Sequence, residues 1–515
     1  MPKFTKTEKS WIMYDWANSV YATIIMSAVF PIYFASIARS NGIAGDVWWG
    51  YATSASSLLI ALTAPFLGAL GDFKGMKKKL FTCSLLFGAF FTAFMAFTDQ
   101  PLLMLLGYSF SFIGFEGTSL FYDSFLTDVT TRDRMNKVSA YGYAMGYLGG
   151  STIPFLISIA LILFGSSIGV DGTLAVKLSV VLTVLWWLIF SLPILRHVHQ
   201  THYISMPKSK MFRNTFVNIK ETVLAIIHNR KLLFFMIAYF FYIDGVGTVI
   251  SMSTSYGSTL GLSSSLMILA LLLTQILAVP FSILFGRLSE HFGTHRMLQG
   301  GVLIYMLICL LGFYLGFSLE PHQKAYENEF IHVVNQSNAQ LDQQTINTVE
   351  KNGRSILASS DRTEAFNKQM DELSQSMNST EKAELQKMKT DVDSFLSDTN
   401  RSSDYTNALH FSTLLFWVVA ILVSTSQGGI QALSRSFFAK LIPANRSNEF
   451  FGFYDIFGKF AAVIGPALYA FSAALTGRSS FGILSLLIIF AVGFGSLTLS
   501  KVHMSTQKSV ETEEV

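Results

Sequence analysis

The chain contains the sequence Gly68-Ala69-Leu70-Gly71-Asp72-Phe73-Lys74-Gly75-Met76-Lys77-Lys78-Lys79-Leu80 and, much further along, the related sequence Gly286-Arg287-Leu288-Ser289-Glu290-His291-Phe292-Gly293-Thr294-His295-Arg296-Met297-Leu298. Both fit one pattern, Gly-x-Leu-x-acid-x-x-Gly-x-x-base-x-Leu. Each stretch joins two long apolar segments, an arrangement for which a soluble protein has little use. The repeat therefore indicates a membrane protein built from two related halves.

The composition agrees with a membrane protein, since 51% of the 515 residues are hydrophobic and only 14% are charged. A helix needs roughly 20 apolar residues to cross the hydrocarbon layer of a bilayer. The segments predicted to span the membrane are 11–39, 47–71, 80–98, 101–128, 138–165, 175–196, 231–256, 265–289, 297–318, 408–437, 449–475 and 479–500.

An even number of spans, with the repeated loop at matching places in the two halves, predicts an all-α membrane protein of two six-helix bundles. Residues 1–196 would form the first bundle and 197–230 a basic cytoplasmic connector. The second bundle would comprise 231–318 and 408–500, interrupted by a polar insert, 319–407, and followed by a tail, 501–515.

Lys and Arg are distributed unevenly along the loops. They gather at both ends of the chain, in both repeated loops, in the connector and in the segment with Arg435, Lys440 and Arg446, whereas the opposite short loops hold Arg39, Lys177 and Arg478. Positive loops stay in the cytoplasm during insertion. Both termini and both repeated loops are therefore predicted to be cytoplasmic, in a plasma or bacterial inner membrane. The net charge of +4 gives no reason to expect a nucleic-acid partner.

By the same rule, the insert, 319–407, is predicted to be extracytoplasmic. Its apolar residues are mostly spaced by three, four, seven or eight positions, which predicts two or three amphipathic helices folded on each other. A mobile solvated loop is the alternative. A partner-binding role and a lid role both remain open for this insert.

The connector has an apolar stripe that predicts a helix lying on the membrane surface, formed by Phe212, Phe216, Ile219, Val223, Ile226 and Ile227. Its histidines, His197, His199 and His202, have no Cys or carboxylate company, and Cys83 and Cys309 lie within predicted spans. No metal, cofactor or disulfide is predicted from these residues. No phosphate-binding loop or nucleophile elbow is present either, so the sequence predicts no enzyme.

Several charged and polar side chains fall inside predicted spans, where an ionised group costs roughly 2.5–3.5 kcal/mol unless it meets water or a partner. The residues predicted to bind substrate or to couple transport to protons are Asp15, Asn18, Glu116, Asp123, Asp244, Gln427, Gln431, Arg435, Asp455 and Lys459. Structural acids hydrogen-bonded to neighbouring helices are the alternative. Asp455 and Lys459, one turn apart, also fit a local ion pair with a purely structural role.

The two repeated loops are predicted to gate the cytoplasmic end. Their glycines permit close approach, their acids would hold a facing helix N-terminus or a base, and the lysines would meet anionic lipid. A merely topological role for the lysines is the alternative. The predicted gate residues are Gly68, Asp72, Gly75, Lys77, Lys78, Gly286, Glu290, Gly293 and Arg296.

The repeated loops resemble the signature loop of the major facilitator superfamily. Other segments resemble the autophagy-related vacuolar effluxer family within it: Tyr14-Asp15-Trp16-Ala17-Asn18-Ser19, Phe121-Tyr122-Asp123-Ser124-Phe125-Leu126, Asp244-Gly245-Val246-Gly247-Thr248 and Gln431-Ala432-Leu433-Ser434-Arg435-Ser436. The resemblance covers nearly all of the membrane part and excludes the insert. It implies the twelve-helix major facilitator fold, a central cavity lined by helices 1, 4, 7 and 10, and alternating access. Asp123 departs from the family pattern, in which Asn or a small polar residue is expected.

Fungal members of that family are associated with amino-acid efflux from the vacuole. The sequence therefore predicts a secondary transporter, proton-coupled through its buried acids, that exports small polar metabolites such as amino acids. One alternative is a lipid or glycolipid flippase, because the many Phe and Met residues would line an apolar cavity. The other is a non-transporting membrane scaffold or receptor that acts through a partner of the insert.

Overall fold

The computed structural model describes residues 3–41, 45–150, 153–205, 208–337, 341–357, 362–375 and 377–513, and its regular elements there are helices. The first half contains α1 (Lys6–Tyr21), the π-helical segment η1 (Ala22–Ala28), α2 (Phe30–Ser40), α3 (Gly45–Gly71), α4 (Met76–Met95), α5 (Pro101–Ser124), α6 (Leu126–Val129), α7 (Met135–Gly149), α8 (Ile153–Phe164), the 3₁₀ turn η2 (Gly165–Ile168) and α9 (Gly172–His197).

The connector and the second half follow in the same chain order. They contain α10 (Lys208–His228), α11 (Arg230–Thr259), α12 (Ser264–Phe292), α13 (Thr294–Gln336), α14 (Gln343–Leu357), α15 (Arg362–Ser374), α16 (Ser379–Ser397), α17 (Thr399–Leu441), the 3₁₀ turn η3 (Ala444–Arg446), α18 (Ser447–Thr476) and α19 (Ser479–Glu513).

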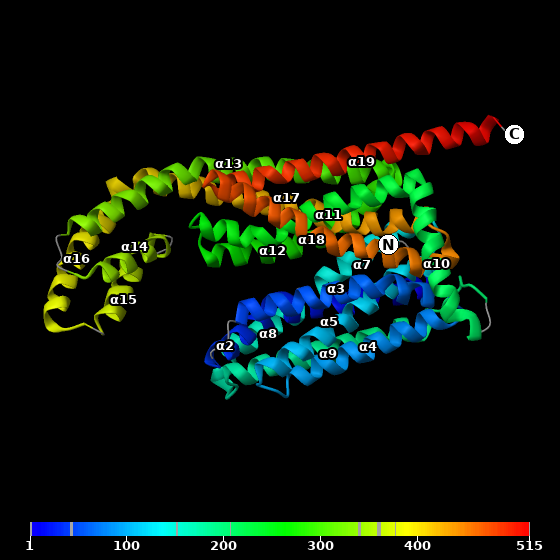
Figure 1. Cartoon of the computed structure of the whole chain (residues 1–515), viewed down its shortest axis with the longest axis horizontal. Helices are drawn as coiled ribbons and strands as arrows, with labels where there is room; N and C mark the ends of the chain where they lie inside the picture. The colour runs from blue at the N-terminus through cyan, green and yellow to red at the C-terminus, as the bar shows by residue number, and fades with distance from the viewer. Residues whose placement is uncertain are drawn as a thin grey trace.

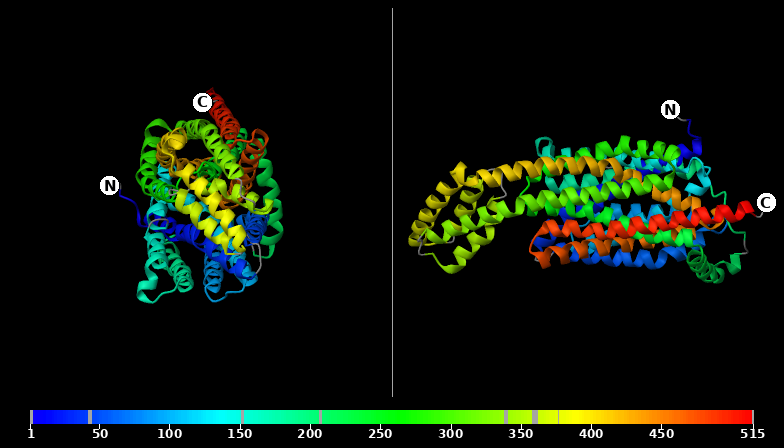
Figure 2. Two further views of the ribbon diagram at one scale, coloured as in Figure 1. Left: turned by 90° about the vertical axis from the view of Figure 1, so that its left-hand side faces the viewer. Right: turned by 90° about the horizontal axis from the view of Figure 1, so that it is seen from above.

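The helices form two elongated bundles that lie side by side (Figure 1). They meet where α3 and α5 pack against α18, and where α7 packs against α12 and α17. We call the end of the bundles that holds both repeated loops the loop end. The opposite end, from which α14, α15 and α16 project, is the insert end (Figures 1 and 2).

Eleven segments of the described chain are long and apolar enough to cross a membrane. Large apolar side chains face outward along them, with Leu62 70%, Phe90 65% and Leu414 69% exposed, as lipid contact requires. α5 is not among the eleven, because polar residues such as Glu116 lower its mean hydropathy, yet it packs against α3 and α4 as a member of the first bundle. The count of twelve spans therefore stays a prediction.

Two predicted spans of the first half are interrupted. The first passes from α1 through the π-helical turn η1 into α2. The fifth is divided between α7 and α8, where Gly149 and Gly150 lie against Trp16 and Ser19 of α1, at distances that leave no room for a side chain. These glycines let the two helices approach closely.

The ninth and tenth spans are longer than predicted. α13 continues past the predicted end at 318 to Gln336, and α17 begins at Thr399 rather than at 408. Pro321 does not stop α13, because the buried residues Leu319, Tyr326 and Phe330 continue its apolar stripe against α16 and α17. The boundary between second bundle and insert thus lies within continuous helices.

The insert is helical, as its residue spacing predicts. Tyr326 of α13 stacks between Phe395 and Tyr405, with ring centroids at 5.1 and 5.3 Å, and the guanidinium of Arg362 lies 4.9 Å from the Tyr405 ring. Phe330 packs beside this stack and is fully buried. The insert therefore has an aromatic core of its own.

The predicted helix in the connector is α10, which packs against α3 and α18 at the loop end (Figure 1). It buries Thr215, Thr222 and Ile226 and leaves Val223 and Ile227 exposed. The predicted positions Phe212 and Phe216 lie outside the described side chains. An outward apolar face on a helix of this kind suits the membrane surface.

Phe330→Ala tests whether the insert folds around this core. Removing a buried phenylalanine costs about 3–5 kcal/mol, so amide hydrogen exchange should accelerate in α15 and α16 but not in α4 or α5. Exposed Lys387→Ala is the control and should change neither region. Equal acceleration throughout the chain after Phe330→Ala would contradict a separate core.

Candidate functional site

One arginine from the second half binds two carboxylates of the first half. Arg435 of α17 is 2% exposed, and its Nη1 lies 2.9 Å from Asp123 Oδ1 of α5 while its Nη2 lies 3.2 Å from Asp15 Oδ2 of α1. Nε donates to the hydroxyl of Ser139 on α7 at 2.9 Å. We call Asp15, Asp123, Ser139 and Arg435 the central cluster.

Aromatic rings enclose the guanidinium of Arg435. Its central carbon lies 4.7 Å from the Trp11 ring, 4.5 Å from Tyr143 and 5.3 Å from Tyr122. Tyr122 also donates its hydroxyl to Asp15 Oδ2 at 2.6 Å. Cation–π contacts and charged hydrogen bonds together compensate the arginine for lost hydration.

Gly142 of α7 makes room for the central cluster. A methyl group at this position would collide with the Asp15 carboxylate and would lie 3.2 Å from both Arg435 Nη2 and Trp11. α7 therefore passes close enough to α1 and α17 for Ser139, one turn before Gly142, to reach the guanidinium. This spacing depends on the absence of a side chain.

Arg435 falls within the predicted span 408–437, although it also counts among the positive charges that predict the cytoplasmic side. Lys440 and Arg446 follow it closely in sequence, but α17 runs on to Leu441, so Arg435 lies within the helix. The acids of the first and fourth predicted spans, which have no base nearby in sequence, find their base here. Sequence reasoning missed Trp11, Tyr122, Ser139 and Tyr143, whose roles depend on packing between helices.

The other predicted substrate residues lie around this region. Asn18 is buried on α1, and Glu116 is half-buried on α5, two turns from Asp123 and on the same face. Gly428 of α17 lies close to Tyr147 of α7. Its neighbour Gln427 shares a hydrogen bond with that tyrosine. Gln431 is half-buried on α17. Of the predicted substrate residues, Asp15, Asp123, Arg435 and Gln427 thus make contacts between the two halves.

Asp244 lies apart from the central cluster, at the contact of α11 with α18 near Gly465. Asp455 is half-buried on α18. The side chain of Lys459 lies outside the described side chains, so the predicted Asp455–Lys459 ion pair remains a prediction.

The first repeated loop fastens the two halves at the loop end. Asp72 accepts hydrogen bonds from the backbone N–H groups of Asn448 and Glu449 at 3.0 Å each, and from Asn448 Nδ2 at 2.8 Å. These amides lie in the first turn of α18, where the helix dipole favours a negative charge. Gly68 allows the approach, because a side chain there would collide with the Asn448 carbonyl.

Lys77 and Asp128 form a buried ion pair beside Asp72. Their atoms Nζ and Oδ2 are 2.6 Å apart, both side chains are fully buried, and Lys77 also donates to Ser447 of α18 at 3.0 Å. The expectation that Lys77 meets anionic lipid is therefore wrong. Its neighbour Lys78 is half-buried and lies 3.5 Å from His199.

The buried acids Asp72 and Asp128 differ in what stabilises their charged forms. Burial raises the pKa of Asp72 to about 7, because the Lys77 charge and the Asn448 and Glu449 amides only partly offset its desolvation. Burial also acts to raise the pKa of Asp128, but the Lys77 charge and hydrogen bonds from residues 201 and 202 hold it below the ordinary value. A direct ion pair thus makes the difference.

The second repeated loop fastens the halves through different residues. Asn136 of α7 donates to Ser289 at 2.9 Å and to Thr294 at 2.7 Å, and accepts from Ser436 and Lys440 of α17. Glu290 and Arg296 are exposed, so the gating role predicted for this loop's acid stays a prediction. The hydrogen bonds of Asn136 are made with neighbouring hydroxyl-bearing residues and with Lys440.

Glycines fix the geometry of both loops. Gly75 and Gly293 have positive φ angles of 73° and 86°, which other residues rarely adopt. Gly286 lies against Ala140 of α7, closer than a side chain would allow. The Gly75 N–H donates to Gln200 of the connector at 2.9 Å, so the connector braces the first loop.

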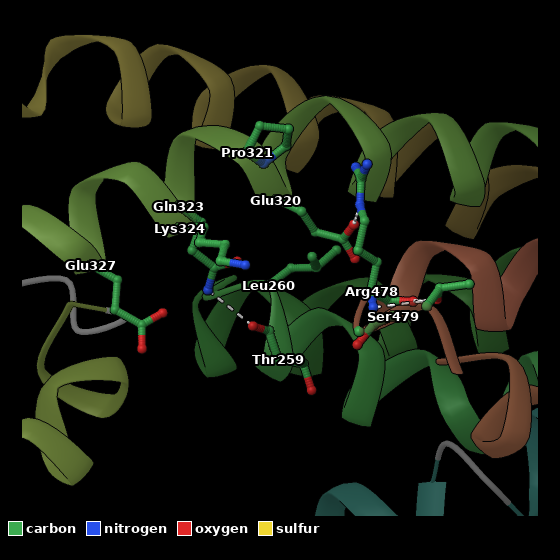
Figure 3. A pocket seen from close by; sticks show the side chains of 11 residues that line it. Thr259, Leu260, Glu320, Pro321, Gln323, Lys324, Glu327, Arg478 and Ser479 are labelled. Carbon is green, nitrogen blue, oxygen red and sulfur yellow. Dashed lines mark hydrogen bonds and ion pairs between the residues drawn. The ribbon is translucent and has the colours of Figure 1, made fainter. Parts of the chain in front are cut away.

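A hollow of about 470 Å³ lies at the insert end, within the second half. Glu320 there accepts hydrogen bonds from Arg478 Nε at 2.7 Å and from the backbone N–H of Ser480 at 2.8 Å, as Arg478 and Glu320 face each other in Figure 3. Its charges are thus used to join α13 to the start of α19. The hollow does not touch the central cluster.

The chain is similar in sequence to known proteins. The sequence profile of the family described as vacuole effluxer Atg22 like matches residues 49–331 and 412–510. A Bacillus subtilis protein, "Uncharacterized MFS-type transporter YxiO", is 38% identical over 100% of this chain and 99% of its own. Autophagy-related protein 22 of Cryptococcus neoformans is 31% identical over 19% of this chain and 18% of its own.

Solved structures share the fold at low sequence identity. The human organic anion transporter MFSD10 superposes with a TM-score of 0.60 at 14% identity, covering 96% of this chain and 100% of its own. The transporter FucP in its outward conformation gives a TM-score of 0.53 at 12% identity, covering 96% and 97%.

Fold and comparisons together define a multi-pass membrane transporter of the major facilitator superfamily. Within that superfamily, the chain belongs to the vacuole effluxer Atg22-like family.

Asp72→Asn should weaken closure of the loop end. Two carboxylate oxygens accept three N–H groups, whereas an amide offers one acceptor and sets its own N–H groups against donors. The loss of one or two hydrogen bonds to a charged acceptor, about 1.5–3 kcal/mol, predicts a roughly ten- to hundredfold shift toward open states. Double electron–electron resonance would measure this shift as the distance between spin labels at Lys79→Cys and His291→Cys, with Cys83 and Cys309 replaced. Exposed Glu290→Gln is the matched control, and an equal shift in both variants would contradict this role of Asp72.

Closure of the loop end should also depend on pH. The buried Asp72 of the closed form has a pKa of about 7, whereas an exposed aspartate has 3.8, so the closed form binds the proton more tightly. This contribution to closure is fully present below the pKa of the exposed group and is lost as pH rises through about 7. The same labels should report a longer mean distance at pH 8 than at pH 6. The dependence should be clearly smaller in Asp72→Asn; an undiminished dependence there would assign it to another group, such as Lys440, which donates to Asn136.

Proposed function

We propose that this protein is a proton-coupled exporter of small zwitterionic metabolites such as amino acids, working by alternating access. The observation that carries the proposal is the central cluster. There, Arg435 of the second half binds Asp15 and Asp123 of the first half, and all three side chains are largely withdrawn from water. A contact of this kind is made or broken whenever the two halves tilt apart.

The charges of the central cluster call for a movable cation. Two carboxylates against one guanidinium leave one negative charge in excess, which is costly inside a membrane protein. A proton on one carboxylate removes the excess. Asp123 is the better site for it, because its side chain is 18% exposed against 12% for Asp15 and only Asp15 receives the Tyr122 hydroxyl.

A substrate carboxylate suits the same arginine. Guanidinium binds carboxylates through paired N–H groups, so a substrate carboxylate would compete with Asp123 for Nη1 of Arg435. Released from that bond, Asp123 becomes free to take a proton or to pair with the amino group of the substrate. Binding of substrate and movement of the proton would then be linked through one hydrogen bond.

The Asp72 contact and the central cluster must both open before substrate can exchange with the loop end. Asp72 must leave the amides of α18, and Arg435 must leave α1 and α5. In the structure both are in place, which corresponds to a closed loop end. With the loop end facing the cytoplasm, as the distribution of Lys and Arg predicts, the cycle would export substrate across a plasma or bacterial inner membrane.

The test is flux of labelled amino acids in liposomes containing the purified protein, driven by an imposed pH gradient. Wild type should accumulate substrate only with the gradient. Asp123→Asn should keep substrate exchange but lose accumulation, because no proton moves at that site. Arg435→Lys should lower both by roughly ten- to hundredfold, since a lysine cannot replace the planar fork.

Gly142→Ala is a second test, and Gly300→Ala is its matched control. A methyl group at 142 would enter the central cluster, whereas one at Gly300 meets nothing within 4 Å, so only the first should abolish flux. Translocation of lipid analogues without amino-acid flux would favour a flippase. No flux at all, with a soluble partner bound to the insert, would favour a scaffold, and either result would overturn the proposal.

A further inference from the structure

Three buried oxygen atoms of α11 lack hydrogen-bond partners among the described residues. They are both carboxylate oxygens of Asp244 and the hydroxyl of Thr248. Both residues are 1% exposed and, one turn apart, lie on the same face of the helix. Buried polar atoms are paired in nearly all native structures, so three unpaired oxygens on one face require an explanation.

The missing bonds are not made within α11. Other buried threonines in this protein bond back to their own helix, as Thr92 does to Gly88 at 2.7 Å and Thr183 to Ser179 at 2.9 Å. Thr248 does not. Its hydroxyl and the carboxylate face α18 instead, at Gly465.

Gly465 holds the backbone of α18 against these oxygens. A methyl group at 465 would overlap the Thr248 hydroxyl and lie 3.0 Å from Asp244 Oδ1. The amide of Gly465 faces Asp244 without completing a hydrogen bond of normal geometry. Pro466, next in the helix, has no N–H, which leaves the carbonyl four residues earlier without its helical donor. The backbone of α18 at Gly465 therefore adjoins the Thr248 hydroxyl and Asp244 Oδ1.

No basic side chain pairs with Asp244 among the ion pairs of the described residues, which include the pair of Arg435 with Asp15. A lone carboxylate inside a membrane bundle needs a counter-charge. A proton would neutralise it, but the single O–H so formed could bond to only one of the other oxygens. A cation bound between the oxygens would satisfy all three, and oxygen is the ligand that hard cations prefer.

We propose that Asp244 and Thr248, against Gly465, form a binding site for one monovalent cation of the sodium type. A single positive charge matches the single carboxylate, so the occupied site is neutral, whereas a divalent ion would leave an excess charge. The site lies on α11 and α18, whose movement relative to each other would open or close it. As a coupling ion it extends the proposed transport function, but its binding is measured without any transported substrate.

The experiment is binding of radioactive sodium to the purified full-length protein at constant ionic strength in choline chloride. Wild type should show saturable binding of one ion per chain. Asp244→Asn should weaken it at least roughly tenfold, as expected for loss of a charged ligand, and Thr248→Val should weaken it less. Gly465→Ala should also weaken it, whereas Gly247→Ala, whose methyl group meets nothing within 4 Å, should bind as wild type does.

The unfolding temperature of each variant in choline chloride shows whether it is folded. If Asp244→Asn does not fold, Thr248→Val and Gly465→Ala still decide the matter. Absence of saturable sodium binding in wild type, or unchanged affinity in all three site variants, would overturn the proposal. Sodium binding with no amino-acid flux would leave the site standing while refuting the proposed substrate, and flux without sodium binding would do the reverse.

Discussion

The two halves of this transporter are joined by a charge that neither half could bury alone. Arg435 enters the interface from α17, and its acceptors Asp15, Asp123 and Ser139 come from three helices of the first half. Removing one partner of a buried ion pair leaves an uncompensated charge and typically costs about 3–5 kcal/mol. Contact between the halves is therefore favourable only in a defined register, and separating them requires water, a proton or a ligand to replace the lost partners.

The repeated loops show how two related halves diverge. In the first loop, an acid binds the amides at the start of α18 and a buried lysine pairs with Asp128. In the second, Ser289 and Thr294 accept hydrogen bonds from the side chain of Asn136, while the acid at the matching position is exposed. The loop end thus closes through a carboxylate and a buried ion pair on one side, and through an amide held by two hydroxyls and by Lys440 on the other.

Apolar run length and the repeat were enough to predict an all-helical bundle architecture, and the spacing of apolar residues was enough to predict the helical insert. Helix ends were less predictable, since Pro321 lies within α13 and the apolar stripe of the insert continues that of the membrane helix. The central cluster was only half predictable: Asp15 and Asp123 stand out as acids in apolar runs, but their partner lies hundreds of residues away. Arg435 stands out as a base near the end of a predicted span, but the sequence does not show that it pairs with Asp15 and Asp123. Trp11 and Tyr143 look like ordinary aromatic residues until helices are packed.

The continuity of α13 and α17 through the insert end gives the molecule a pair of rigid arms. Each is a helix of 43 residues, about 65 Å long at 1.5 Å per residue, and the aromatic stack around Tyr326 clamps the arms to α15 and α16. If the second bundle rocks as the proposed alternating access requires, the tip of the insert moves further than the bundle itself. A molecule bound to this tip would therefore oppose or favour movement of the second bundle more effectively than one bound close to the bundle.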